Sequence, residues 1–262
     1  MQEQIKTKLL SLSYWPIEKK IVQYKNTKNT ILKFIYSGEF MQKICDSIYD
    51  IIAFSNGIIY TRKKTLENGS ARVSFYGYDI KRMQNTPVTK SVYLLNKFGP
   101  EYKKIAEQLG DYVSCDADIL PSKQVVVVYP TGETGFFSPT GEMVWSSDLL
   151  YQGAEICGAV YDDRQIWSVI PELNCVVSYS VSHKKFSMRI GSKDSNTFEH
   201  PISISKYDNE LFICNRDSNK VRTINLTDYS VNDFRIFDEP VYKYLRSCGK
   251  EIVVLESGVY VL

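Results

Sequence analysis

Residues 202–237 read ISISKYDNELFICNRDSNKVRTINLTDYSVNDFRIF, and this stretch contains four short strand-like segments separated by turns. Apolar and polar residues alternate at 202–205, an apolar run follows at 211–214, and two further segments occupy 221–226 and 233–237. Asn, Asp and Ser residues, which favour turns, separate the segments. We therefore expect one antiparallel unit of four strands in this stretch.

The second strand of this unit, polar residues followed by an apolar run, has counterparts along the whole chain. One residue within each run serves as an anchor: Val22, Tyr60, Val126, Trp167, Phe212 and Val253. With one exception, between Tyr60 and Val126, successive anchors are about 40 residues apart, and this period with several strands per unit is typical of propeller blades. The sequence therefore predicts an all-β protein, with a single domain over 1–262 that forms a six-bladed β-propeller of four-stranded antiparallel blades.

The longer interval between Tyr60 and Val126 points to an insertion, because the strand pattern breaks around positions 86–110. Within it, the segment 100–109 reads PEYKKIAEQL and places Ile105 and Leu109 on one helical face, with Gly110 directly after them. This spacing and the following glycine are typical of a short helix. We expect a short helical insertion near residues 86–110, either within the second predicted blade or at its junction with the third.

The end of the chain raises the question of how the ring closes. The last predicted unit ends with GVYVL at 258–262, which corresponds to a third strand. An open ring would leave exposed strand edges, which propellers avoid. We therefore predict that an N-terminal strand at 4–8 pairs beside 259–262 and supplies the missing fourth strand.

The unit at 201–221 resembles an NHL repeat, a pattern of the six-bladed propeller superfamily. PISI at 201–204 is similar to the start of its first strand, LFICN at 211–215 to its apolar strand followed by Asp or Asn, and SNKV at 218–221 to its turn. The resemblance covers this unit well and the other units only in outline. It implies the propeller fold but selects no function, because this superfamily includes interaction domains, lyases and lactonases.

Composition and charge restrict the compartment and the partners. No segment approaches 18 uncharged apolar residues, so no transmembrane helix and no membrane partner are expected. Six cysteines without a CxxC pair lie mostly in apolar runs, which favours buried free thiols and a cytoplasmic location, unless a signal peptide has been removed. Residues 1–110 carry a net charge of +9 and residues 111–262 carry −7, so an acidic partner would be attracted to the first part.

Motifs of known enzymes are absent from the sequence. It contains no GxSxG, HExxH or phosphate-binding loop, and only two histidines, His183 in a predicted outer turn and His200 before an inner strand. A lactonase-type propeller would need several oxygen ligands at the axis for Ca²⁺. The candidates for such a channel-mouth site are Glu155, Glu172, Asn215 and Asp217. The metal-binding motifs of gluconolactonase-type families do not match, so the primary expectation is that no cofactor is bound.

Propeller geometry predicts where a ligand would bind. The starts of the inner strands and the turns between second and third strands emerge on one face around the channel, the top face. In this register, that face collects Arg62, Glu155, Glu172, His200, Asn215, Arg216, Asp217, Glu239 and Glu256. Both signs of charge occur among them, which favours a polar or charged ligand. Arg216 is the predicted anchor, because its planar guanidinium binds carboxylates or phosphates through two hydrogen bonds.

Two hypotheses of function follow. The first is a monomeric, non-enzymatic recognition module, which binds a peptide, a protein or a small polar ligand, acidic ones included, on the top face. Nucleic acid is not expected, because the basic cluster at 62–64 is confined to one blade. The alternative is a divalent-cation-dependent hydrolase or lyase of the lactonase-like propeller type.

Overall fold

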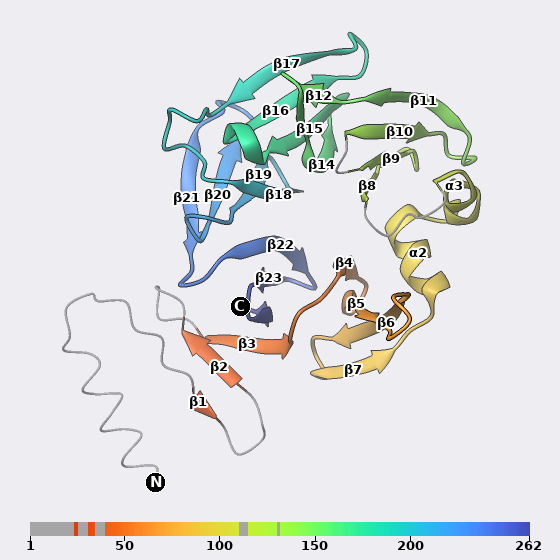
Figure 1. Cartoon of the computed structure of the whole chain (residues 1–262), viewed down its shortest axis with the longest axis vertical. Helices are drawn as coiled ribbons and strands as arrows, with labels where there is room; N and C mark the ends of the chain where they lie inside the picture. The colour runs from red at the N-terminus through yellow and green to blue at the C-terminus, as the bar shows by residue number, and fades with distance from the viewer. Residues whose placement is uncertain (1–23, 26–30, 35–39, 110–114, 130–131) are drawn as a thin grey trace, which may run out of the picture.

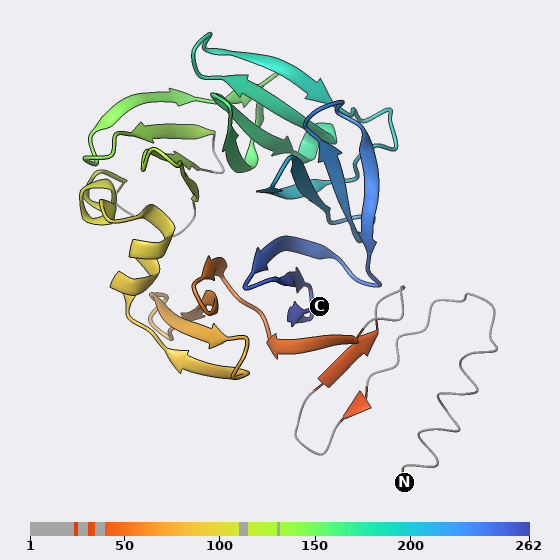
Figure 2. The same cartoon turned by 180° about the vertical axis from the view of Figure 1, so that it is seen from behind.

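Short β-strands dominate the part of the chain that the computed structural model describes, which comprises residues 24–25, 31–34, 40–109, 115–129 and 132–262. Within these residues, the strands form five antiparallel blades, of which four are four-stranded sheets and the fifth is part of a six-stranded sheet. Figures 1 and 2 show the blades arranged in a ring, seen from opposite sides. In four of the blades the strand first in sequence is innermost and the other three follow in order. In the last blade the three inner strands come from the end of the chain, and the fourth comes from its beginning. The fold is therefore a closed β-propeller.

The blades have the following strands, given from the channel outward. Blade 1 consists of β4(Asp50–Phe54), β5(Gly57–Thr65), β6(Ala71–Asp79) and β7(Gln84–Pro87); blade 2 of β8(Asp116–Ile119), β9(Val125–Val128), β10(Glu133–Phe137) and β11(Met143–Asp148). Blade 3 consists of β14(Cys157–Asp162), β15(Gln165–Ile170), β16(Cys175–Ser180) and β17(Lys185–Ile190); blade 4 of β18(Pro201–Tyr207), β19(Glu210–Asn215), β20(Lys220–Asn225) and β21(Val231–Ile236). Blade 5 consists of β22(Val241–Ser247), β23(Lys250–Leu255), β24(Gly258–Val261) and β3(Phe40–Cys45), with β2(Ile31–Phe34) and β1(Tyr24–Lys25) added outside β3, and a small hairpin of β12(Leu150–Tyr151) and β13(Ala154–Glu155) joins blades 2 and 3.

The predicted blade register is confirmed at its described anchors, but the predicted number of blades is wrong. Five anchors lie on second strands, namely Tyr60, Val126, Trp167, Phe212 and Val253. The sixth anchor, Val22, lies outside the described residues. In the described part of the chain the ring closes after five blades rather than six, because β3 pairs directly with β24 and leaves no space for a blade between them.

Ring closure in the described residues uses β3. This strand pairs antiparallel with β24, with Cys45 opposite Val259 and Gln42 opposite Val261. The predicted closing strand at 4–8 lies outside the described residues, and β3 occupies the edge of β24 that was assigned to it. Met41 of β3 is fully buried in the apolar cluster of blades 4 and 5, so closure is secured by packing as well as by backbone pairing.

Two helices lie between blades 1 and 2 in the described residues (Figure 1). The helix predicted at 100–109 is confirmed as α3(Tyr102–Leu109), whereas α2(Lys90–Phe98) was not predicted. The Oγ1 atom of Thr89 caps α2 by accepting a hydrogen bond from the backbone N–H of Val92. Patterning alone missed α2, because its short run of apolar residues is equally compatible with a buried strand.

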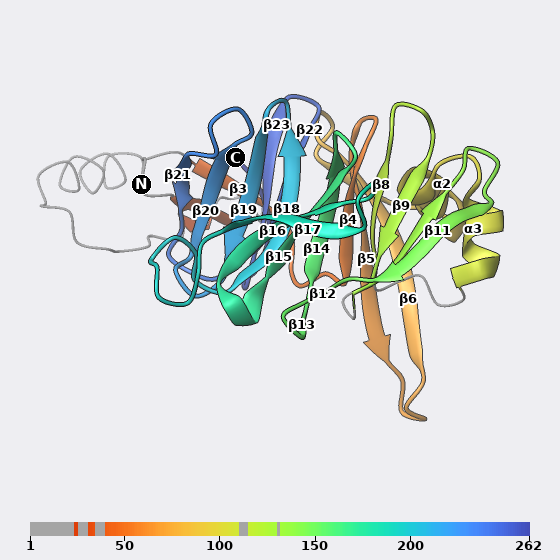
Figure 3. The same ribbon diagram turned by 90° about the horizontal axis from the view of Figure 1, so that it is seen from above.

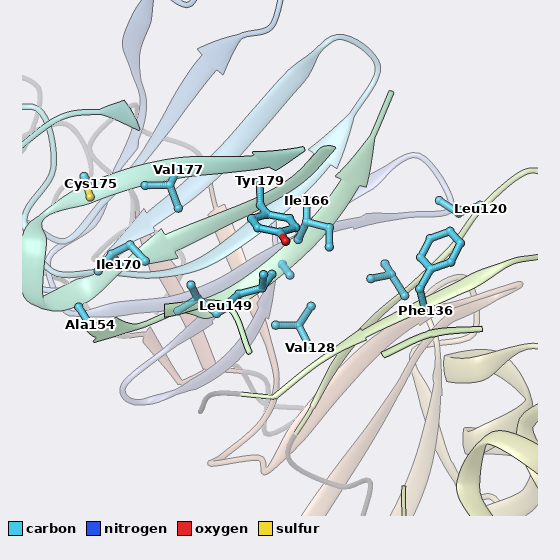
Figure 4. Packing of buried hydrophobic residues seen from close by; sticks show 13 residues of the cluster. Leu120, Val128, Phe136, Leu149, Ala154, Ile166, Ile170, Cys175, Val177 and Tyr179 are labelled. Carbon is cyan, nitrogen blue, oxygen red and sulfur yellow. The ribbon is translucent and has the colours of Figure 1, made fainter. Parts of the chain in front are cut away.

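Helix α2 fills the gap between the first two blades. It contacts the inner strands β4 and β8, and its buried Tyr93, Leu94 and Phe98 join one apolar cluster with residues of both blades. Elsewhere blades pack directly on each other; Figure 4 shows Val128 and Phe136 of blade 2 in the same cluster as Ile166 of blade 3. The helical insertion thus replaces direct contact between blades at one place in the ring and brings side chains of α2 toward the channel.

The cysteines agree with the prediction of free, mostly buried thiols. All six are described and none forms a disulfide; Cys157 is half-buried, Cys248 is exposed, and the other four are buried. Neither helix in the described residues combines the length and the apolar character needed to cross a membrane.

Candidate functional site

The inner strands place charged side chains on the wall of the channel. Asp50 is the first residue of β4, Asp116 is the first residue of β8, and Lys243 is the third residue of β22. The Nζ atom of Lys243 lies 3.8 Å from Oδ1 of Asp50 and 3.6 Å from Oδ1 of Asp116. We call these three residues, contributed by three separate blades, the axial neck.

The axial neck is supported from behind by α2. The Nζ atom of Lys97 lies 2.8 Å from Oδ2 of Asp50, and the hydroxyl of Tyr93 donates a hydrogen bond to the same oxygen. The side chains of Lys97 and Asp50 are only 5% and 14% exposed, whereas those of Lys243 and Asp116 are 29% and 37% exposed. The Lys97–Asp50 side of the cluster is therefore closed to solvent, and the Lys243–Asp116 side faces the channel.

The ionisation of the cluster follows from these contacts. Burial alone would raise the pKa of Asp50, but attraction by Lys97 and Lys243, together with hydrogen bonds from Lys97 and Tyr93, holds the pKa below its ordinary value. Burial would lower the pKa of Lys97 and of Lys243, but the neighbouring carboxylates of Asp50 and Asp116 outweigh it and raise both. Asp50, Lys97 and Lys243 are therefore charged at neutral pH. Burial raises the pKa of Tyr93, which remains a hydrogen-bond donor.

Two cavities meet at the axial neck. The upper one, of about 410 Å³, is lined by the starts of the inner strands and by Glu256 in the β23–β24 turn, so it opens toward the top face. The lower one, of about 360 Å³, is lined by later parts of the inner strands, including Lys206 and Tyr207. Lys206 is paired there with Asp162 at 3.2 Å. Cavities of this size accommodate small molecules, and each of them reaches all three residues of the axial neck.

Glu256 is the one residue of the predicted set of nine that lines either axial cavity. Glu239 lies nearby in the same blade and accepts hydrogen bonds from the backbone N–H of Ser257 at 2.9 Å and from its hydroxyl at 2.6 Å, which holds the β23–β24 turn. Glu155 belongs to β13, and Glu172 lies in a short 3₁₀ helix, η1(Pro171–Leu173).

Other predicted residues make local contacts within blade 4. Asn215 is fully buried, and its side chain accepts from the N–H of Glu199 and donates to the carbonyl of Ile213. Arg216 pairs with its neighbour Asp217, with Nε 2.9 Å from Oδ1.

The remaining two predicted residues do not line either axial cavity. His200 is in the loop before β18, and its backbone N–H donates to Oδ1 of Asn174. Arg62 lies on β5 over the rings of Tyr60 and Tyr76. The structure therefore does not bring the nine residues together into one cluster at the axis.

Sequence reasoning missed the axial neck itself. A sequence signal for it exists. The segment before each described anchor is an inner strand, and charged residues such as Lys243 occur within these segments. Lys97 could not be found in this way, because it comes from the helix that was not predicted.

Comparisons with known proteins support the propeller fold but do not assign the chain to a family. No protein-family model matches the chain, and no curated protein sequence matches it, so the resemblance to NHL repeats is not confirmed. Among solved structures, a catalytically inactive virginiamycin B lyase from Staphylococcus aureus, determined with quinupristin, has a TM-score of 0.50 at 9% identity, over 92% of this chain and 98% of that one. A streptogramin B lyase has a TM-score of 0.45 at 14% identity, over 92% of this chain and 78% of that one. An auxiliary nutrient binding protein from Bacteroides ovatus has a TM-score of 0.45 at 8% identity, over 92% of this chain and 66% of that one.

Proposed function

We propose that this propeller is a binding module whose upper axial cavity holds a small polar ligand with a cationic group. The observation that carries the proposal is the axial neck: Asp116 and Lys243 are partly exposed at the base of a cavity of about 410 Å³, and Glu256 lies on its wall. Side chains of separate blades thus converge on a single concave site, as expected for a ligand pocket.

The charge of the cavity favours a cationic group on the ligand. Asp50, Asp116 and Glu256 contribute three carboxylates, whereas Lys243 within the cavity and Lys97 behind it contribute two ammonium groups. The excess of one negative charge favours an amine on the ligand, placed near Asp116 or Glu256.

Lys243 supplies the second feature of the proposed site. Its separations of 3.6 and 3.8 Å from the two carboxylates are longer than the 2.8 Å contact of Lys97. The ammonium of Lys243 therefore has room to donate a hydrogen bond to an oxygen of the ligand. The lyase from Staphylococcus aureus was determined with quinupristin, which is consistent with small-molecule binding by propellers of this general fold.

The alternative remains a divalent-cation-dependent hydrolase or lyase. In its favour, the carboxylates of Asp116 and Glu256 line the same cavity and are of the kind that Ca²⁺ prefers. Against it, the ammonium of Lys243 lies beside Asp116 and repels a divalent ion about twice as strongly as it repels the single charge of an amine at the same distance. The two functions predict opposite responses to metal and to small amines.

A thermal-shift experiment separates them. The full chain is titrated with Ca²⁺, with Zn²⁺, with EDTA and with a panel of small amines, amino acids and carboxylic acids. We expect amine-containing compounds to raise the melting temperature of the wild type but not that of Asp116→Asn or Lys243→Met. Arg216→Ala and Glu155→Ala, which alter the predicted top-face set outside the axial cavities, serve as matched controls.

Three results would count against the binding proposal. One is a shift that persists in Asp116→Asn, and another is a shift that is lost only in Arg216→Ala, which would return the site to the originally predicted anchor. The third is a shift with Ca²⁺ alone that EDTA reverses, which would favour the metal-dependent alternative.

A further inference from the structure

The β5–β6 hairpin of blade 1 extends well beyond its neighbours. The pairing of β4 with β5 begins at Asp50 and Thr61, and the pairing of β6 with β7 begins at Tyr76 and Pro87, whereas β5 and β6 pair with each other as far as Thr65 and Ala71. Figure 3 shows this hairpin projecting from one face of the disc. We call its projecting part, residues 62–74, the basic ribbon.

The edge of β5 that faces away from β6 is open in the basic ribbon. The carbonyl of Thr61 accepts a hydrogen bond from the N–H of Tyr49, so the backbone of Thr61 points away from β6. Because backbone direction alternates along a strand and the β5–β6 register has no bulge, the N–H and C=O groups of Lys63 and Thr65 point the same way. No strand of the described residues pairs with β5 at these two positions.

Basic side chains cover the basic ribbon. Arg62, Lys63, Lys64 and Arg72 are all exposed, and Lys64 lies directly opposite Arg72 in the β5–β6 register. Like charges at directly opposed positions destabilise a sheet. Glu67 is the single acidic residue between 62 and 74, and Asp46, which lines the adjacent space, is paired with Lys43 at 2.7 Å. Carboxylates from another molecule would therefore relieve the repulsion.

The space beside the open edge has the size of a peptide groove. It has a volume of about 550 Å³ and lies between residues 46–49 and residues 62–64. Its walls are ordered by aromatic contacts: the guanidinium of Arg62 lies 5.6 and 5.7 Å from the ring centres of Tyr60 and Tyr76, and Nζ of Lys63 lies 5.0 Å from that of Tyr49. These contacts reduce the freedom that the cationic side chains would lose on binding.

We propose that the basic ribbon binds an extended acidic segment of another protein, which adds as a strand to the β5 edge at Lys63 and Thr65. The backbone supplies hydrogen bonds to the peptide, and Arg62, Lys64 and Arg72 bind alternate carboxylates on one face of it. The open backbone edge selects a peptide over nucleic acid, which cannot continue a β-ladder. Residues 47–49 line both this groove and the upper axial cavity, but the binding groups on β5 and β6 line neither axial cavity. The proposal is therefore tested independently of the proposed function.

Fluorescence anisotropy with labelled peptides tests the proposal. The probe is a short peptide in which Glu alternates with Val, and a peptide with Lys in place of Glu is its control. We expect saturable binding of the acidic peptide to the full chain, weakening with salt, and a loss of about tenfold or more in Lys64→Glu/Arg72→Glu. Lys103→Glu reverses an exposed charge on α3 and should retain the affinity.

The backbone contribution is tested with proline. Lys63→Pro removes an N–H that points to the open edge of β5 and leaves the β5–β6 ladder intact. Lys63→Ala removes only the side chain. We expect affinity to fall about tenfold with Lys63→Pro and about threefold or less with Lys63→Ala. If Lys63→Pro does not fold, as judged by circular dichroism, Thr65→Pro repeats the test at the next residue whose backbone faces the open edge.

Three outcomes would overturn the proposal. The first is the absence of saturable peptide binding at concentrations up to about 1 mM. The second is unchanged affinity in the proline variants. The third is equal affinity for a labelled oligothymidylate, which would make the basic ribbon a general site for polyanions.

Discussion

The ammonium of Lys97 lies 2.8 Å from the carboxylate of Asp50, although the two residues are far apart in the sequence. Lys97 belongs to the helix inserted between blades 1 and 2, and Asp50 begins the inner strand of blade 1. Both side chains are almost inaccessible to solvent. The contact therefore links the helical insertion to the wall of the channel through a buried ion pair.

Removing one partner of this pair should be strongly destabilising. Lys97→Met leaves the carboxylate of Asp50 buried without its closest cation, and we expect the free energy of unfolding to fall by about 3–5 kcal/mol in urea titrations. The double variant Asp50→Asn/Lys97→Met should recover a large part of that loss. Arg82→Met is the control, because Arg82 is 4.0 Å from Asp79 and its side chain is 79% exposed; its effect should stay within about 0.5 kcal/mol. Equal losses in Lys97→Met and Arg82→Met would contradict this role.

The same pair predicts an acid-sensitive stability. The pKa of Asp50 is lower in the folded protein than its ordinary value of about 3.9, so the unfolded chain binds more protons near that pH. The stabilisation is complete above the ordinary pKa and is lost as pH falls through the folded-state pKa. Urea titrations from about pH 6 downward should show a shallower acid dependence in Asp50→Asn/Lys97→Met than in the wild type. Identical slopes would show that Asp50 does not contribute.

Gly258 should be required for ring closure. Its φ is +145°, and a Cβ atom there would overlap the backbone oxygen of Cys45 in β3. Gly249 also has a positive φ, of +72°, but a Cβ atom would meet nothing within 4 Å. We therefore expect Gly258→Ala to destabilise the protein by about 1–3 kcal/mol more than Gly249→Ala, as measured by thermal and urea unfolding. Similar effects of the two substitutions would argue against closure through β3.

The thiols should differ sharply in reactivity. Cys248 is exposed, whereas burial raises the pKa of Cys115 and Cys157 to about 11 and that of Cys214 to about 12. Iodoacetamide at about pH 8 should therefore modify the native protein once, at Cys248, as shown by intact mass and peptide mapping. Cys248→Ser should abolish the modification, and urea should expose the other thiols. Rapid native labelling of Cys214 would contradict the packing of blade 4.

Strand patterning predicted most of the fold. Tyr60, Trp167 and Phe212 were placed on second strands because apolar runs bounded by turn residues report local structure directly. The number of blades was overestimated because repeat counting assigns each apolar run to a blade of its own. Whether β3 begins a blade or completes one depends on which edge it pairs with, and its partner β24 comes from the opposite end of the chain.

The site was less accessible to sequence reasoning. Propeller topology predicts Glu256 on the top face, and this residue lines the upper cavity. In contrast, Arg216 pairs with Asp217, and Asn215 is buried within its own blade. Turn residues share a face of the disc, but whether one reaches the axis depends on how far its loop extends inward.

The sequence by itself determined the blade register and one helix, because the patterns of apolar residues and turns act within single blades. Only the tertiary structure decided the number of blades, the closing strand and the neighbours of Asp50. Those depend on contacts between distant segments: Lys97 approaches Asp50 from the helical insertion, and Lys243 approaches it from the inner strand of the last blade. Local propensity contains no information on such contacts, since ring closure and the packing of α2 are set by the burial of apolar surface between blades.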